Sequence, residues 1–257
     1  MKLSSGKISR YKYAICLFLG INIIAMLMSA CGKKEAAPDT EPYPSFMENE
    51  ELSTYIDESL LDPLVKSADK EVYIKCGAFS GKGIIYNVTD EKMIIATAAH
   101  VLSSGGASEA NVKFRDGTEA LGKAIYSDKT DAGFVVIDRE TLNNTTYEAY
   151  EGVHRDRELF DNIEKDSPVF IANPDAGNGL YCDYGILTEK WIYAEYYDNY
   201  IMLVKASGSE GLSGSALLSE EGVFLGIVSG MNDEGELAII PYSVVESEYA
   251  ELVRNFL

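Results

Sequence analysis

The 257-residue sequence has little of several residue types that particular functions require. It contains two histidines and four cysteines, and none of them form the closely spaced pairs that are typical of metal sites. The sequence also has no GxxxxGK[ST] phosphate-binding loop and no repeat of fixed period. We therefore expect no metal ion and no other cofactor.

Basic side chains are also scarce, with 22 Lys and Arg against 41 Asp and Glu and a net charge of −19. Six of the basic residues lie within the first 34 positions, so the rest of the chain is more acidic than the whole. Such a surface repels phosphate backbones, which excludes nucleic acid as a partner. The content of 46% hydrophobic and 25% charged residues is ordinary for a globular protein.

The N-terminus has the pattern of a secretory signal. Basic residues precede the apolar run "YAICLFLGINIIAMLMSA", which ends in small residues. The following "MSAC" resembles a bacterial lipobox, in which the signal is cut before Cys31 and this cysteine carries lipid, although Met28 stands where Leu is usual. This resemblance predicts a lipoprotein signal peptide at 1–30 and a lipid anchor in the bilayer, with the protein on the extracytoplasmic face of the bacterial cell envelope.

Two other interpretations of this N-terminus stay open. The apolar run is about 18 residues long, the lower limit for spanning a bilayer, so it also fits an uncleaved transmembrane anchor. In the second interpretation, the match of "MSAC" to a lipobox is a coincidence.

Residues 31–66 are rich in acid, Pro and small polar residues and predict an acidic tether, with a short helix near 51–61. We place the folded domain at 67–257.

The folded part predicts an all-β protein. Short apolar runs rich in β-branched and aromatic residues alternate with turn residues about every ten positions, which is typical of a sandwich or barrel. The closing segment "SVVESEYAELVRNF" changes to helical spacing, with Val245, Tyr249, Leu252 and Val253 on one side. We expect a C-terminal helix that packs on the strands.

Three short motifs carry the residue types of acyl-transfer chemistry. His100 ends the apolar run "MIIATAAH", Asp131 opens "DAGFVVI", and Ser213 lies within "GLSGS". Each of them alone fits a structural role at least as well, as a strand-end histidine, a turn acid or a Gly-Ser turn. Together they supply a base, an acid and a nucleophile.

The spacing of Gly211 and Ser213 favours the catalytic interpretation over the structural one. A serine hydroxyl becomes a nucleophile when an imidazole takes its proton, and the imidazole needs an acid on its other nitrogen. The negative oxygen that then develops on the substrate needs backbone N–H donors. A glycine two positions before the serine lets the chain turn so that both N–H groups converge, which predicts an oxyanion hole from Gly211 and Ser213.

The motifs "TAAH", "TDAGFVVI" and "GLSGSALL", in the order His, Asp, Ser, resemble the chymotrypsin-like (trypsin-like) serine peptidases, especially their compact bacterial HtrA-like branch. The segments "GKGIIYN", "FIANP", "YGILTE", "EGVFLGIVSG" and "LAIIP" are similar to further parts of the same family, as is the hairpin at Asp116 and Gly117. The resemblance covers about residues 70–247. The sequence beyond it leaves no room for a PDZ domain.

The resemblance implies two packed six-stranded antiparallel β-barrels with the catalytic groups at their interface. His100 would be the general base, Asp131 the acid that orients it, and Ser213 the nucleophile that is acylated. Asp128 is an alternative acid, but Asp131 borders the strand directly. The implied function is a membrane-tethered serine endopeptidase, with a polypeptide as its substrate.

Departures from the family pattern concern activation and specificity. Leu212 stands where vertebrate digestive members have an Asp that pairs with a new N-terminus, and Ser215 replaces a glycine. Ser207 occupies the place of the pocket acid of trypsin, which disfavours strict cleavage after Arg or Lys. The resemblance implies that Ser229 and Gly230 belong to the strand along which substrate pairs.

Two alternative functions and the state of the cysteines remain to be considered. A catalytically inactive scaffold that acts as a binding lipoprotein is the alternative function. An esterase of another fold would need a Gly-x-Ser-x-Gly turn and a histidine last in the chain, and this sequence has neither. Cys76 and Cys182 fit either a disulfide or two buried thiols.

Overall fold

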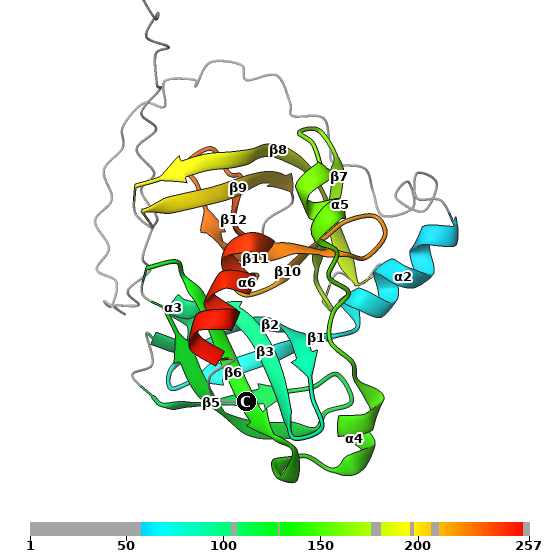
Figure 1. Cartoon of the computed structure of the whole chain (residues 1–257), viewed down its shortest axis with the longest axis vertical. Coiled ribbons are helices and arrows are strands. Elements are labelled where there is room, and N and C mark those ends of the chain that lie inside the picture. Colours follow the sequence, from blue (N-terminus) through cyan, green and yellow to red (C-terminus); the bar gives the residue numbers. More distant parts are fainter. Residues whose placement is uncertain are drawn as a thin grey trace, which may run out of the picture.

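A computed structural model describes residues 58–103, 107–127, 129–175, 181–195, 198–206 and 211–253. Within these residues the chain forms two closed six-stranded barrels in which every strand pair is antiparallel. Figure 1 shows the first barrel below the second, with the C-terminal helix across their junction. The predicted fold class is therefore confirmed.

The first barrel has the strand order β1-β2-β3-β6-β5-β4. Its strands are β1 (Glu71–Cys76), β2 (Phe79–Val88), β3 (Lys92–Ala98), β4 (Glu109–Lys113), β5 (Glu119–Tyr126) and β6 (Ala132–Asp138). The short helix α3 (Ala99–Ser103) follows β3 directly. Strands β3 and β6 are almost continuously buried, because one face lies inside the barrel and the other meets the rest of the protein.

The second barrel has the strand order β10-β11-β12-β9-β8-β7. Its strands are β7 (Pro168–Ala172), β8 (Cys182–Ala194), β9 (Asn199–Ala206), β10 (Ala216–Leu218), β11 (Phe224–Met231) and β12 (Leu237–Pro241). The long strands β8 and β9 pair from Gly185 with Ala206 out to Ala194 with Asn199. Figure 1 shows this pair extending along the outer edge of the barrel.

The C-terminal helix packs where the two barrels meet. Helix α6 (Tyr242–Glu248) continues as one π-helical turn over Tyr249–Val253. Val245 and Val253 are fully buried, Tyr249 is 7% exposed and Leu252 packs against the same core. The side of the helix that the sequence predicts to be apolar is thus the buried side.

Aromatic rings join this helix to both barrels. The Tyr86 ring of β2 meets the Phe224 ring of β11 edge-on at 5.6 Å and the Tyr249 ring at 5.2 Å between centroids. The Tyr86 hydroxyl donates to the Glu246 carboxylate of α6, and burial raises the pKa of this phenol. Edge-to-face pairs of this kind stabilise a packed core beyond their buried area, so the two barrels share one continuous core.

The folded part begins earlier in the chain than we predicted. Helix α2 (Glu58–Ala68) lies partly within the segment that we assigned to the tether, and the predicted boundary at residue 67 falls inside it. Leu64 and Ala68, one helical turn apart, are fully buried in the main core, and Ser67 Oγ donates to the Gly222 carbonyl at 2.6 Å. Helix α2 therefore joins the second barrel through these buried positions.

The polar connection between the barrels also carries short helices. They are a 3-10 turn (Arg139–Thr141), α4 (Asn144–Ala149) and α5 (Arg157–Asn162). The Asn143 and Asp156 side chains cap α4 and α5 by accepting from backbone N–H groups. Phe160 is fully buried, so this connection covers the second barrel as well as linking it to the first.

The two cysteines of the folded part form no disulfide. Cys76 ends β1 of the first barrel and donates to the Leu102 carbonyl at 3.3 Å, whereas Cys182 begins β8 of the second. Both are buried, and burial raises the pKa of the Cys182 thiol. The alternative of two buried thiols is the one found.

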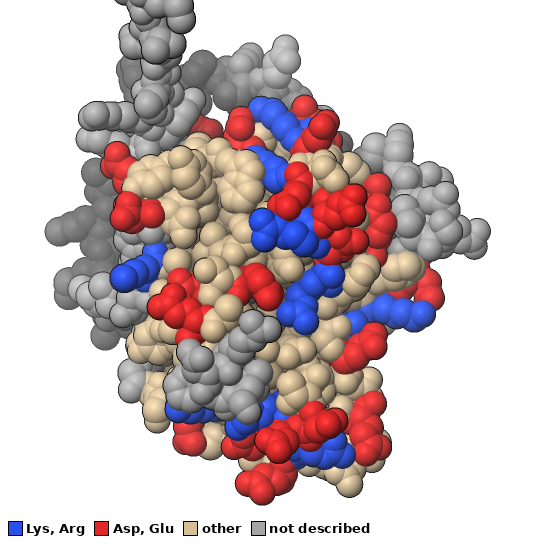
Figure 2. Space-filling view, in the orientation of Figure 1, with Lys and Arg blue, Asp and Glu red and all other residues tan. Residues whose placement is uncertain are grey.

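The surface is acidic on the face shown in Figure 2, where carboxylates outnumber the Lys and Arg side chains between them. Among the described residues, no helix is long and apolar enough to cross a membrane. The predicted signal peptide, the predicted lipidation site at Cys31 and the predicted tether up to residue 57 lie outside the described residues.

Candidate active site

The first barrel brings His100 and Asp131 together through the pairing of two strands. Strand β3 ends where β6 begins, with Ala98 opposite Ala132. The residues just after β3 and just before β6 therefore meet at one end of the barrel. His100 Nδ1 lies 2.9 Å from Asp131 Oδ2, and the His100 backbone N–H donates to Asp131 Oδ1 at 2.8 Å.

The Asp131 backbone adopts a conformation that is uncommon for a residue with a side chain. Its φ is +55°, in the left-handed region, which Asp enters more readily than most residues. The surroundings hold it there: its carbonyl accepts from the Ala99 N–H at 2.7 Å, and its carboxylate also accepts from the Ser229 hydroxyl of the second barrel. The carboxylate is only 8% exposed while the imidazole is 42% exposed, so one edge of the ring is fixed and the other is accessible.

The turn that carries Ser213 is attached to the first barrel by its backbone. The Lys82 N–H of β2 donates to the Ser213 carbonyl at 2.9 Å. A Cβ on Gly81 would lie 2.8 Å from that carbonyl oxygen and 2.7 Å from Val101 Cγ2, so the turn sits beside the helix that carries His100. Among the described residues, no hydrogen bond joins the Ser213 and His100 side chains, and such bonds are often long before substrate binds.

Two backbone N–H groups of the same turn have no acceptor among the residues that the structure describes. Gly211 has a φ of +91°, the left-handed conformation that the sequence argument requires of this glycine. Within the described part of the chain, no acceptor takes the N–H of Gly211 or of Ser213, whereas the Gly214 and Ser215 N–H groups donate to the Val228 and Leu212 carbonyls. Two unpaired donors on one turn are what an oxyanion hole needs.

Strand β11 places Ser229 and Gly230 beside this turn. The Ser229 side chain is buried and donates to Asp131, so it faces the acid and not the solvent. A Cβ on Gly230 would meet nothing within 4 Å. The pairing of β11 with β10 ends at Ile227, but its pairing with β12 continues to Met231, so one edge of β11 has no partner strand among the described residues beyond that point.

Two other predicted positions, Ser207 and the alternative acid Asp128, lie outside the described residues.

Sequence reasoning missed a buried polar cluster behind the turn. Glu71 of β1 is completely buried, and its Oε1 accepts from the Ser215 hydroxyl at 2.9 Å. Lys82 Nζ lies 3.9 Å from the same oxygen and donates to Asn173 Oδ1 at 2.7 Å. Burial raises the pKa of Glu71 well above its ordinary value, although Lys82 and Ser215 act in the opposite direction. The only signal in the sequence was Ser215 at a position where the family has glycine.

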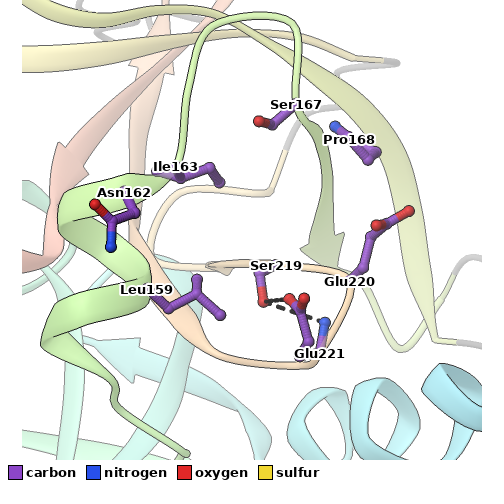
Figure 3. Close-up of a pocket in the computed structure, with 8 residues that line it drawn as sticks. All are labelled: Leu159, Asn162, Ile163, Ser167, Pro168, Ser219, Glu220 and Glu221. Carbon is purple, nitrogen blue, oxygen red and sulfur yellow. Dashed lines mark hydrogen bonds between the residues drawn. The ribbon is translucent and has the colours of Figure 1, made fainter.

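A pocket of about 220 Å³ lies elsewhere, between α5, the start of β7 and the turn after β10 (Figure 3). Ser219 Oγ donates to Glu221 Oε2 there at 2.8 Å. Burial, followed by the neighbouring Glu221, raises the pKa of Glu220. The pocket is lined by neither His100, Asp131 nor Ser213, so it is separate from the candidate active site.

The arrangement of two closed six-stranded antiparallel barrels defines the chymotrypsin-like class of proteins. The Rv3671c protease of M. tuberculosis, in an inactive form, aligns with a TM-score of 0.55 at 17% identity, over 76% of this chain and 96% of that chain. The HtrA-type protease AlgW with a tripeptide aligns with a TM-score of 0.60 at 21% identity, over 74% of this chain and 62% of that one. At these identities the likeness concerns the fold.

The sequence profile of the trypsin-like peptidase domain matches residues 81–227, more than half of the chain. The chain therefore belongs to the trypsin-like peptidase family and is classed as a serine endopeptidase. No curated protein matches it in a sequence comparison.

Proposed function

We propose that the protein cleaves peptide bonds through an acyl-enzyme at Ser213. His100 Nε2 takes the proton of the Ser213 hydroxyl as Oγ attacks the scissile carbonyl carbon. Asp131 keeps the proton of the imidazole on Nδ1 and stabilises the imidazolium that forms. The observation that carries this proposal is the hydrogen bond of 2.9 Å between His100 Nδ1 and the buried Asp131 carboxylate, which leaves Nε2 as the basic nitrogen.

The remaining steps use the same groups in reverse. The tetrahedral oxyanion accepts from the N–H groups of Gly211 and Ser213, and the imidazolium gives its proton to the leaving amine. Water then attacks the ester carbonyl while His100 takes a proton from it, and the imidazolium gives this proton to Ser213 Oγ as the carboxylic acid product leaves. The edge of β11 at Gly230, which pairs with no strand among the described residues, offers backbone groups to an extended peptide, and this fits a polypeptide substrate.

A covalent probe tests this assignment most directly. We expect the full-length protein to gain one phosphoryl group from diisopropyl fluorophosphate, measured by intact mass and mapped to the peptide that contains Ser213. The Ser213→Ala variant should gain none, and its turnover should fall by about 10⁴- to 10⁶-fold. A folded parent protein without an adduct would refute the assignment and favour the alternative of an inactive scaffold that binds its partners.

We also propose that the peptidase acts at the extracytoplasmic face of a bacterial membrane, anchored through lipid on Cys31. The support is the basic and apolar N-terminal segment with its lipobox-like "MSAC". Metabolic labelling with a radioactive fatty acid should mark the parent and not Cys31→Ser. An unlabelled parent that still sediments with membranes would instead support an uncleaved anchor.

A further inference from the structure

The most unusual group outside the candidate catalytic residues is the carboxyl of Glu71. It has no exposed surface, and burying a carboxylate is unfavourable unless other groups satisfy it. Its Oε1 accepts from Ser215 Oγ at 2.9 Å, and the nearest cation, Lys82 Nζ, is 3.9 Å away. Its Oε2 has no hydrogen-bond partner among the described residues. Ser215, the residue that donates a hydrogen bond to the Glu71 carboxyl among the described residues, thus lies two positions after Ser213.

The groups around Glu71 come from both barrels. Lys82 of β2 donates to Asn173 Oδ1 at 2.7 Å and lies 3.6 Å from Asp175 Oδ2. Asn173 in turn donates to Asp183 Oδ2 at 2.6 Å, at the start of β8. Glu71 and Asp175 therefore share the Lys82 ammonium, Asp183 binds the Asn173 amide beside it, and Glu71 is the one acid of the three that is fully buried.

The first barrel holds the nucleophile turn at two points. Lys82 contributes its backbone N–H to the Ser213 carbonyl, and its own carbonyl accepts from Thr97 Oγ1 at 2.6 Å and lies against Gly214. Glu71 provides the second point, through the Ser215 hydroxyl. Residues 211–215 contain no charged side chain of their own, so the carboxylate that binds the turn is supplied by β1.

We propose that Glu71 is a positioning residue, which fixes the Ser215 hydroxyl and thereby the turn that presents Ser213 and its oxyanion donors. This inference rests on the proposed function, because it assigns a role to a residue that acts through the nucleophile turn. A strand from the first barrel thus sets the geometry of a turn in the second. A displacement of reacting groups by about 1 Å can lower turnover about 100-fold.

The first test compares three variants of the full-length protein. We expect Glu71→Ala and Ser215→Ala each to lower kcat by about 10- to 100-fold with KM within about twofold, because the turn is misplaced while the substrate strand is intact. Glu71→Gln should keep most of the parental kcat, since its amide oxygen still accepts from Ser215. The double variant should be no slower than the slower single variant, because both substitutions break the same hydrogen bond.

Ser67→Ala is the matched control. It removes another buried serine hydroxyl, on helix α2, which donates one hydrogen bond to the Gly222 carbonyl and lies away from the nucleophile turn. We expect it to lower the melting temperature without changing kcat at 25 °C. If Glu71→Ala and Ser215→Ala behave as Ser67→Ala does, the proposal is overturned.

Amide hydrogen exchange separates this inference from the proposed nucleophile. Peptides that cover Gly214 and Ser215 should exchange faster in Glu71→Ala and Ser215→Ala than in the parent and in Ser67→Ala. Unchanged exchange there would overturn the positioning role even in an active enzyme. Faster exchange in a protein whose Ser213 takes no fluorophosphonate would refute the proposed nucleophile and still support the placement of the turn by Glu71.

Discussion

The substitution Gly214→Ala tests how closely the nucleophile turn is fitted to the first barrel. Gly214 has a φ of +92°, and a Cβ at this position would lie 1.9 Å from the Lys82 carbonyl oxygen and 2.4 Å from Thr97 Oγ1. The Lys82 carbonyl oxygen belongs to the backbone of strand β2 and already accepts a hydrogen bond from Thr97 Oγ1. The turn, and not the strand, must therefore move.

The expected size of the effect has two parts. A left-handed backbone costs an L-residue about 1 to 2 kcal/mol. In addition, the turn must retreat by more than 1 Å before the new Cβ reaches even 3.0 Å from the carbonyl. Because a misplacement of about 1 Å can lower the rate about 100-fold, we expect kcat/KM of Gly214→Ala to fall at least that far.

Gly117→Ala is the matched control for backbone strain. Its φ is +85°, and a Cβ there would meet nothing within 4 Å. It lies between β4 and β5, in the hairpin that Phe114 closes by accepting from the Gly117 N–H. We expect it to lower the melting temperature by about 2 to 8 °C, from about 1 to 2 kcal/mol of strain, and to leave kcat/KM unchanged.

The assays are thermal unfolding and hydrolysis of a peptide substrate at a temperature where both variants stay folded. If Gly214→Ala unfolds at the same temperature as Gly117→Ala and keeps the parental kcat/KM, then the turn does not pack against β2 as described.

Three further predictions concern other contacts. Leu64→Ala should lower stability by about 2 to 5 kcal/mol in unfolding experiments, since the Leu64 side chain of α2 is fully buried; an unchanged melting temperature would contradict the packing of this helix. Ser229→Ala should lower kcat about tenfold or more, because the Asp131 carboxylate loses a buried donor; kcat equal to that of the parent would show that this bond does not hold the acid. The Glu71→Gln protein should gain stability relative to the parent as the pH rises. The folded-state pKa of Glu71 is raised well above 4.5, so its favourable contribution is complete below about pH 4.5 and is lost as the pH passes the folded value. Melting temperatures of both proteins from about pH 4 to pH 8 check this, and a constant difference would refute it.

The sequence predicted the barrels because strand periodicity and family motifs are local signals. It did not predict that α2 belongs to the core. Leu64 and Ala68 stand beside other apolar residues, such as Val65, and the local sequence does not show which of these positions meets the core near Gly222. In the segment between the barrels, Phe160 is likewise fully buried among mostly polar neighbours.

For the candidate site, the motifs named His100, Asp131 and Ser213, and strand pairing explains how the first two meet. The contacts that hold these groups were not visible in the sequence. Glu71 and Ser215 are 144 positions apart, and nothing in either local segment indicates that they are paired. The contact exists because the two barrels pack in one relative orientation, which is a property of the whole chain.

The division of the site between two barrels also affects the life of the protein before it is complete. The N-terminal barrel, with its histidine and aspartate, leaves the ribosome first, and the strands around Ser213 follow about a hundred residues later. Under the proposed mechanism, a nascent chain has the base without the nucleophile until the segment around Ser213 has been made. Hydrolysis by this mechanism therefore requires that the second barrel has folded against the first.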